Sequence, residues 1–254
     1  KLTLVLRITI WLIIRNQPDQ NGYAGFTQAS STSQAVSLAG FKQNMRQVLR
    51  YRNTRLLLVI PGGMVGAVLT FSGLWGIPFL VTHFDLTTNQ AARLTSCLLI
   101  GWAVGGPVFG WLSGQMGKRK PIYIVGGIMS AIGWFVILYV DGLSYYPIAS
   151  VLVLTGFFSG CIITSFPFAG ESVSQELSGT VSGMTNMGIM VGPTLLQPLV
   201  GIILDRCWDG AMADGVRVYS LEAFRIGFIP MMAWLILSAF LLFFTRETYC
   251  RQAA

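Results

Sequence analysis

The sequence predicts an all-α membrane protein whose chain crosses the bilayer six times in full. Composition gives the first two observations: 53% of the 254 residues are apolar and 11% are charged, whereas a soluble domain carries about 25% charge. The third is that the mean hydropathy of +0.63 is concentrated in six apolar stretches. Each stretch is about as long as a helix needs to cross roughly 30 Å of hydrocarbon.

We expect a transmembrane helix in each stretch. A membrane barrel would show strands of about 10 residues with strict alternation, and the run LLLVIPGGMVGAVLTFSGLWGIPFL has none. Together the spans predict a six-helix bundle over 56–245. They are 56–81, 91–113, 121–140, 147–170, 180–204 and 224–245.

Two segments precede the bundle. In residues 1–15 an apolar run is interrupted only by Arg7; we interpret it as the end of a truncated transmembrane helix, with an interfacial helix as the alternative. Residues 16–55 are interpreted as a cytoplasmic linker that ends in a basic amphipathic helix on the membrane surface. The apolar face is Phe41, Met45, Val48 and Leu49, and the basic residues are Lys42, Arg46, Arg50, Arg52 and Arg55.

Basic residues also predict the orientation. With 15–55, 114–120 and the tail 246–254 on one side, 11 Lys and Arg lie there and at most four lie on the other side. Because cytoplasmic loops hold the excess of basic residues, we expect this side and the C-terminus to be cytoplasmic in an inner cell membrane. The net charge of +7 therefore indicates topology and not nucleic-acid binding. The 11 residues are Arg15, Lys42, Arg46, Arg50, Arg52, Arg55, Lys118, Arg119, Lys120, Arg246 and Arg251.

Catalysis is not predicted. The four cysteines are far apart in sequence, and His83 is the single histidine, so no metal-ligand cluster is expected. No Asp, Glu, Lys or His lies in the middle of a span, where such residues mark ion pathways. We expect no catalytic residue, no metal and no cofactor, and we expect any coupling charge to lie outside this chain.

Glycine and proline predict close helix contacts with kinks. Gly-xxx-Gly pairs recur through the spans, and a longer pattern repeats once. GWAVGGP at 101–107 and GIMVGP at 188–193 fall in the second and fifth spans, which run in opposite directions. Two three-helix units of opposite topology form an inverted repeat, which recurs in transporters. The pairs are Gly62/Gly66, Gly101/Gly105, Gly106/Gly110, Gly156/Gly160, Gly179/Gly183 and Gly188/Gly192.

Neutral polar and aromatic side chains in the membrane interior are candidate solute contacts. Hydroxyls and amides on kinked helices bind small polar solutes, but Ser and Thr there also bond across helices or to a carbonyl one turn earlier. Both interpretations stay open. The candidates are Thr70, Ser72, Trp75, Thr155, Phe158, Ser159, Asn186 and Gln197.

Residues 110–121, GWLSGQMGKRKP, resemble the loop motif G-x-L-a-D-r-x-G-r-k of the major facilitator superfamily, in the version found between helices 8 and 9. Gly114 stands where the family has Asp, and Gln115 where it often has Arg, so the acidic latch of the family is in question here. The matching residues are Gly110, Leu112, Gly117, Lys118 and Arg119.

The resemblance covers essentially the whole chain. RNQPDQNGY is similar to the segment after helix 6 of the family, and SGTVSGMTNMGIMVGPTLLQPLVGIILD is similar to helix 11. It implies the C-terminal six-helix half of a twelve-helix transporter, built from two inverted three-helix repeats. It also implies that helices 7 and 10 line a central cavity, helices 8 and 11 flank it, and helices 9 and 12 face lipid.

The resemblance further implies a cytoplasmic gate at the loop motif. Glu171, at the inner end of helix 10, is expected to pair with Lys118 or Arg119. A solvated acid at a helix end is the alternative.

The predicted function is secondary active transport of a small polar organic solute by alternating access. Its partners would be the solute, the bilayer and a missing N-terminal six-helix half, with a coupling proton or ion left open and no nucleic acid. A hydrophobic-drug efflux pump of the same fold and a non-transporting membrane sensor or scaffold are the alternatives. A membrane enzyme is disfavoured, because clustered acid and base groups are missing.

Overall fold

The computed structural model describes residues 38–213 and 215–252. The expected truncated helix over 1–15, the first part of the linker and the side chain of Phe41 lie outside the described residues. The bundle considered below is the compact unit that begins at Lys42.

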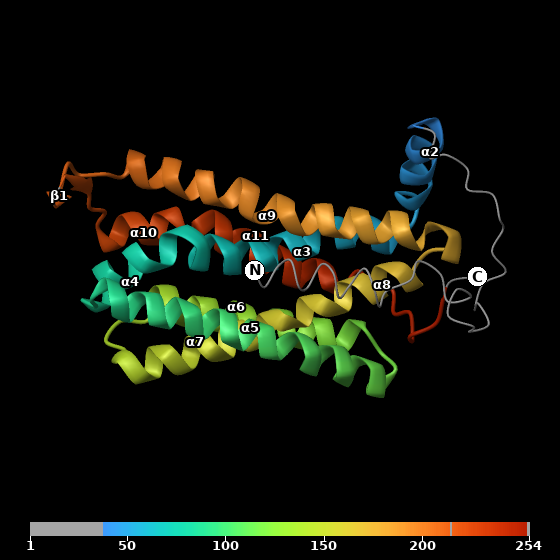
Figure 1. Ribbon diagram of the computed structural model, residues 1–254, viewed down its shortest axis with the longest axis horizontal. Helices are drawn as coiled ribbons and strands as arrows, with labels where there is room; N and C mark the ends of the chain where they lie inside the picture. Colours follow the sequence, from blue (N-terminus) through green and yellow to red (C-terminus); the bar gives the residue numbers. More distant parts are fainter. Residues whose placement is uncertain (1–37, 214, 253–254) are drawn as a thin grey trace, which may run out of the picture. The chain divides into compact units, whose positions relative to one another are not determined.

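Within the described residues, six helical segments are long and apolar enough to cross a membrane, which confirms the expected six-span fold (Figure 1). The first begins at Arg52, ahead of the expected start at residue 56, and the last ends at Leu242, short of 245. The segments are Arg52–Phe84, Thr88–Met116, Lys120–Tyr139, Tyr145–Glu171, Gln175–Arg206 and Leu221–Leu242.

Irregular turns interrupt the first helix of each three-helix unit. In the first span, α3 (Arg52–Thr70) passes through the π-helical turn η2 (Phe71–Trp75) into α4 (Gly76–Phe84). In the fourth span, α7 (Tyr145–Ser159) passes through the 3-10 turn η3 (Gly160–Thr164) into α8 (Ser165–Glu171). Such turns mark places where helix geometry is locally adjusted, often at functional sites.

The remaining elements complete the two units. The sixth span is divided into two helices, and a 3-10 turn precedes the fifth span. A short antiparallel hairpin follows the fifth span, with Met212 opposite Arg217 and Ala213 opposite Val216. The elements are α5 (Thr88–Met116), α6 (Lys120–Tyr139), η4 (Gln175–Leu177), α9 (Ser178–Arg206), β1 (Met212–Ala213), β2 (Val216–Arg217), α10 (Leu221–Gly227) and α11 (Ile229–Leu242).

The surface helix is shorter than expected. Helix α2 spans Leu38–Val48, and extended backbone at Tyr51 separates it from α3. Arg52 and Arg55, assigned to the surface helix from sequence, therefore belong to the first span. Val48 is fully buried, so the apolar face of α2 meets protein at that residue.

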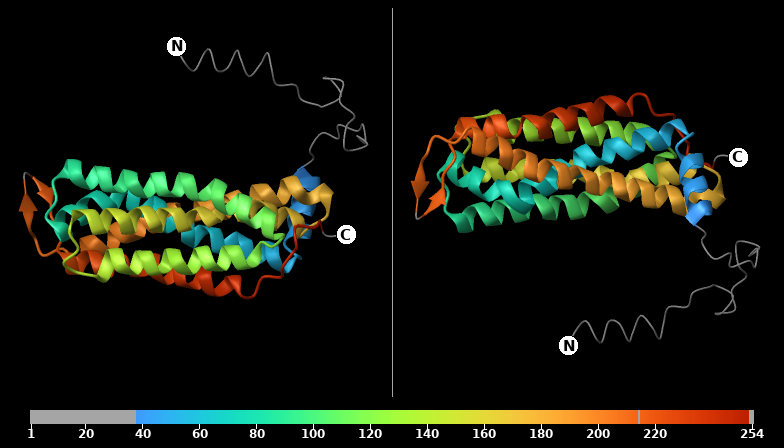
Figure 2. Two further views of the ribbon diagram at one scale, coloured as in Figure 1. Left: turned by 90° about the horizontal axis from the view of Figure 1, so that it is seen from below. Right: turned by 90° about the horizontal axis from the view of Figure 1, so that it is seen from above.

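The glycines of the repeat explain how the units pack. A side chain at Gly101 or Gly105 of α5 would overlap carbonyl oxygens of α7, and one at Gly188 or Gly192 of α9 would overlap carbonyl oxygens of α3. Figure 2 shows these helices running side by side, and the two pairs have the most extensive contacts in the bundle. Equivalent helices of the two units thus make equivalent contacts, as an inverted repeat requires.

The other glycine pairs differ in whether they face a neighbouring helix. Gly156/Gly160 and Gly62/Gly66 supply the facing surfaces of α7 and α3, where an added side chain would again meet backbone. Gly179 and Gly183 face open space, and Gly110 of the Gly106/Gly110 pair makes only an ordinary contact. The pairs that repeat between units are the ones that join helices.

The connections lie at two opposite ends of the bundle (Figure 1). We call the end formed by residues 116–120, 171–177 and 243–252 the loop-motif end. The end formed by 85–87, 140–144 and 207–220 is the hairpin end.

Candidate functional site

A glycine turns the chain at the loop motif. Helix α5 ends at Gly117, whose φ of 61° is left-handed and so favours glycine. The Ser113 hydroxyl donates to the carbonyl of Lys118 at 3.0 Å and accepts from Arg119 Nη1 at 3.1 Å. The turn thus directs Arg119 back across the end of α5.

Arg119 forms a buried ion pair with Glu171 from the end of α8. Arg119 Nη2 lies 2.7 Å and Nε lies 3.1 Å from Glu171 Oε1, and each side chain is 13% exposed. This hydrogen bonding raises the pKa of the Arg119 guanidinium further above its usual value. Of the two bases considered from sequence, Arg119 makes the contact, and Lys118 is exposed.

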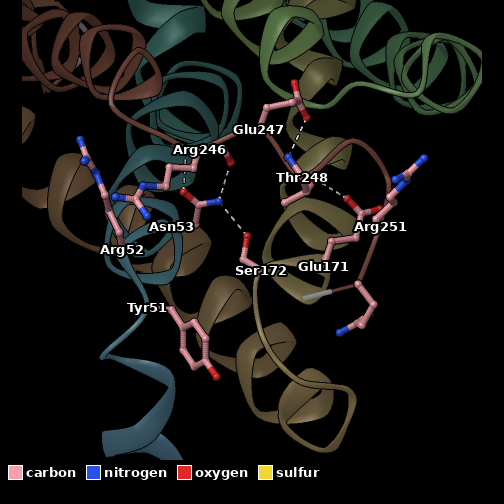
Figure 3. A pocket seen from close by; sticks show the side chains of 10 residues that line it. Tyr51, Arg52, Asn53, Glu171, Ser172, Arg246, Glu247, Thr248 and Arg251 are labelled. Atoms are coloured by element: carbon pink, nitrogen blue, oxygen red, sulfur yellow. Dashed lines mark hydrogen bonds between the residues drawn. The ribbon is translucent and has the colours of Figure 1, made fainter. Parts of the chain in front are cut away.

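The segment after the last span completes the cluster (Figure 3). The Thr248 hydroxyl donates to Glu171 Oε2 at 2.6 Å. The Glu247 carboxylate accepts the backbone N–H groups of Arg119 and Lys120, both at 2.9 Å, and so caps the N-terminus of α6. Together these contacts join three segments that are far apart in sequence.

Asn53 links the start of α3 to the segments at the loop-motif end. Its side chain donates to Ser172 Oγ and to the carbonyl of Arg246, both at 2.8 Å, and accepts the Arg246 N–H at 2.8 Å. Sequence reasoning missed Asn53, Glu247 and Thr248. The one available signal was their position just inside the first span or just after the last span.

The other motif positions serve the loop in simpler ways. Leu112 packs partly buried against the core, and Gly110 is near Ile163. A side chain at Gly114, where the resembling family has Asp, would meet nothing within 4 Å. Packing therefore does not require glycine at position 114. Because glycine has no side chain, this position also lacks the carboxylate that the resembling family has there.

Within the spans, the structure brings two candidate residues together at the π-helical turn. Trp75 Nε1 donates to the backbone carbonyl of Gln197 at 3.0 Å, and Gln197 Nε2 donates to the carbonyl of Leu69 at 3.1 Å. Both side chains are partly exposed. Gly73 and Gly201 make room for them, because an added Cβ would lie 3.3 Å from the Gln197 amide and 2.9 Å from the Trp75 ring.

The remaining candidates are scattered. Thr155 and Ser159 are 1% exposed and bond to carbonyls one turn earlier; Ser159 also bonds to Ser130 of α6 at 2.8 Å. Thr70 is fully buried. Their burial fits the helix-packing interpretation better than contact with a solute.

Three further candidates lie nearer the surface of the bundle. Ser72 donates to the carbonyl of Val68. Phe158 is half-buried beside Phe157 and Phe109. Asn186 is exposed on α9.

Comparison with known proteins adds independent findings. A family profile described as Major Facilitator Superfamily matches residues 62–250. An uncharacterised protein of Archaeoglobus fulgidus is 30% identical over 154 residues, which cover 59% of this chain and 68% of that protein. Solute carrier family 22 member 7 of Mus musculus is 29% identical over 133 residues, covering 51% of this chain and 24% of the carrier.

Two sugar transporters are also similar. The galactose-proton symporter of Escherichia coli is 23% identical over 127 residues, covering 46% of this chain and 25% of the symporter. The inward-open xylose transporter XylE of E. coli shares the fold with a TM-score of 0.59 at 16% identity, covering 76% of this chain and 48% of XylE. The chain thus spans about a quarter of each curated carrier and about half of XylE.

Proposed function

This chain belongs to the Major Facilitator Superfamily and is part of a multi-pass membrane protein, and from that premise we propose that it moves a small polar organic solute across the membrane by alternating access. The observation that carries this proposal is the buried pair between Arg119 and Glu171. It joins the α5–α6 loop to the end of α8 through charged groups, which water can solvate when the two segments separate. We propose that this pair is the gate of the loop-motif end.

We propose that the loop-motif end faces the cytoplasm. Ten of the Lys and Arg residues in the described segments lie at this end and four lie at or near the hairpin end, and the positive-inside rule places the larger group inside. The ten are Lys42, Arg46, Arg50, Arg52, Arg55, Lys118, Arg119, Lys120, Arg246 and Arg251; the four are Arg93, Arg206, Arg217 and Arg225.

We propose that the solute meets Trp75 and Gln197. The indole ring at an irregular turn supplies a stacking surface. The Gln197 amide gives one N–H to the carbonyl of Leu69, which leaves its second N–H and its Oε1 for a hydroxylated solute. Sugars are the first solutes to test, because two relatives are a galactose symporter and a xylose transporter. The coupling proton of that symporter makes a pH gradient the first driving force to apply.

The test is uptake of radiolabelled galactose or xylose by the purified protein in proteoliposomes. Glu171→Gln keeps the shape of the side chain and removes its charge. We expect uptake to fall at least about tenfold, since loss of one partner costs roughly 3–5 kcal/mol in a fully buried pair and about 2 kcal/mol in this pair, whose side chains are 13% exposed. The matched control is Asp205→Asn, which alters the exposed pair at the hairpin end and should leave uptake unchanged.

Three results would count against the proposal. Equal uptake by wild type and Glu171→Gln would contradict the proposal that the Arg119–Glu171 pair is a gate. Extrusion of an apolar dye with no sugar uptake would favour the efflux alternative, and no transport of either kind would favour a sensor or scaffold. For the solute contact, Gln197→Leu should raise KM roughly fivefold while kcat changes less.

A further inference from the structure

A polar cavity opens at the loop-motif end beside the gate. Its volume is about 360 Å³, at the lower end of the range for small-molecule sites. The start of α3, the end of α8 and the segment after α11 all line it. Three arginines are among the lining residues: Arg52, Arg246 and Arg251.

The two carboxylates that line the cavity are already engaged. Glu171 accepts from Arg119 and Thr248. Glu247 accepts two backbone N–H groups at the N-terminus of α6. Three arginines against two carboxylates leave the lining of the cavity with a net positive charge.

The three arginines are exposed, and no carboxylate within 38–213 or 215–252 forms an ion pair with any of them. Figure 3 shows Arg52 and Arg246 projecting on the same side of Asn53, with Arg251 beyond Thr248 and Glu171. Guanidinium groups that share one cavity repel each other, and an anion bound between them removes that repulsion.

We propose that this cavity binds a phosphate-bearing ligand through Arg52, Arg246 and Arg251. Guanidinium groups bind phosphate through paired, charge-assisted hydrogen bonds. The same phosphate chemistry occurs in soluble phosphate compounds and in phospholipid headgroups. Either ligand would meet the same three arginines.

Binding would act on the gate. Arg246 is hydrogen-bonded through its backbone to Asn53, and Thr248, two residues later, holds Glu171. An anion that joins Arg52 to Arg246 and Arg251 would hold these segments together and slow opening of the loop-motif end. This consequence for transport rests on the proposed function, whereas binding itself does not.

The test measures binding without transport. The purified protein is placed in nanodiscs of neutral phosphatidylcholine, and its thermal unfolding midpoint is followed while inorganic pyrophosphate is added, with potassium chloride at equal ionic strength as the reference. A second arm replaces part of the lipid with phosphatidylglycerol. A saturable rise in the midpoint is expected in at least one arm.

Variants assign the response to the cavity. Arg52→Gln with Arg251→Gln should weaken binding at least roughly tenfold. Arg206→Gln with Arg217→Gln removes two charges near the hairpin end and should leave it unchanged. Arg52→Lys with Arg251→Lys keeps the charge and should bind with intermediate affinity, which gives a second measurement if the Gln variant does not fold.

The arms separate the sources of the phosphate. A response to pyrophosphate supports a soluble ligand, and a response to phosphatidylglycerol alone supports a lipid headgroup. No saturable response in either arm, or an equal loss in the hairpin-end variant, would overturn the proposal. Because neither arm measures uptake, failure of sugar transport leaves this result intact.

Discussion

The two ends of the bundle both hold an arginine–carboxylate pair, but only the loop-motif end buries it. Arg119 and Glu171 are each 13% exposed, whereas Arg217 and Asp205 are 48% and 51% exposed. Exposed pairs contribute little to stability, while loss of one partner of a buried pair is costly. The same chemistry thus serves as a strong contact at one end and a weak one at the other.

The ends also differ in which parts of the chain they join. In the Arg119–Glu171–Thr248 cluster, Glu171 is separated from Arg119 by 52 positions and from Thr248 by 77 positions along the sequence. At the hairpin end, Asp205 accepts from Arg217 and Tyr219 within one loop, and Arg217 lies over the Trp208 ring. A contact within one loop can persist while helices move, so it constrains the ends of the spans less.

The hairpin end does contain one contact between distant segments. Arg225 pairs with Asp141, which is 66% exposed. His83 lies 3.6 Å from the same carboxylate, and among the residues that the structure describes neither of its buried ring nitrogens has a hydrogen-bond partner. This contact is more exposed to water than the Arg119–Glu171 pair, and it leaves the His83 ring without a hydrogen bond to any described residue.

The largest expected effect comes from removing Arg119. Arg119→Ala leaves the Glu171 carboxylate largely buried with one remaining donor. We expect the free energy of unfolding to fall by about 2 kcal/mol, less than the roughly 3–5 kcal/mol of a fully buried pair, because Glu171 is 13% exposed and keeps Thr248. Thermal or denaturant unfolding in detergent measures it. Lys118→Ala is the control, since its side chain is exposed; equal destabilisation by both variants would contradict the comparison.

The second prediction concerns the cap of α6. Glu247→Gln removes the negative charge that accepts two N–H groups at that helix start, and we expect a loss of about 1 kcal/mol. Glu222→Gln is matched to it, because Glu222 is exposed in the first turn of α10, where Ser220 supplies the cap. A larger loss for Glu222→Gln would show that charge, and not capping, matters.

The third prediction uses Cys250 as a reporter of the cluster. Burial, together with Glu171 and Glu247, raises the pKa of the Cys250 thiol, while Arg119 opposes this. In Glu171→Gln one negative charge is lost, so this pKa should fall and the thiolate fraction at pH 7.5 should rise. We expect alkylation at Cys250 to accelerate roughly threefold, measured by mass spectrometry of the peptide; an unchanged rate would argue against it.

The smallest expected effect is at the hairpin end. Asp205→Asn should leave the unfolding midpoint unchanged within error, because the pair is exposed and local. The hydrogen bond to Asp205 raises the pKa of Tyr219, so this pKa should fall toward its usual value in the variant. A fall in stability comparable to that of Arg119→Ala would remove the distinction between the ends.

Sequence predicted the parts of this structure that depend on local patterns. The spans follow from runs of apolar residues, and close helix contacts follow from glycines four residues apart. Which helices these glycines join, α5 with α7 and α9 with α3, is known only from the structure. The sequence also directed attention to Glu171 and the bases of the loop motif. It did not distinguish Lys118 from Arg119, because the two are adjacent and the direction of the turn depends on Gly117 and Ser113.

The remaining parts depend on contacts between distant residues. From the sequence, Glu247 and Thr248 belong to a short cytoplasmic tail, since nothing nearby indicates that α6 begins and α8 ends beside them. The π-helical turn at Phe71–Trp75 has no local sequence pattern either. Its stabilising contact comes from Gln197, more than 100 residues away.

The glycine contacts have a consequence for how this bundle is able to deform. Sliding by one helical turn is about 5.4 Å, and it would bring Leu58 in place of Gly62, or Thr70 in place of Gly66, against the backbone of α9. The glycine contacts therefore fix the position of α3 along α9, and they fix the position of α5 along α7 in the same way. Each pair is therefore held against sliding by its glycine contacts, and the irregular turns at Phe71–Trp75 and Gly160–Thr164 are where the helix geometry of the first and fourth spans changes.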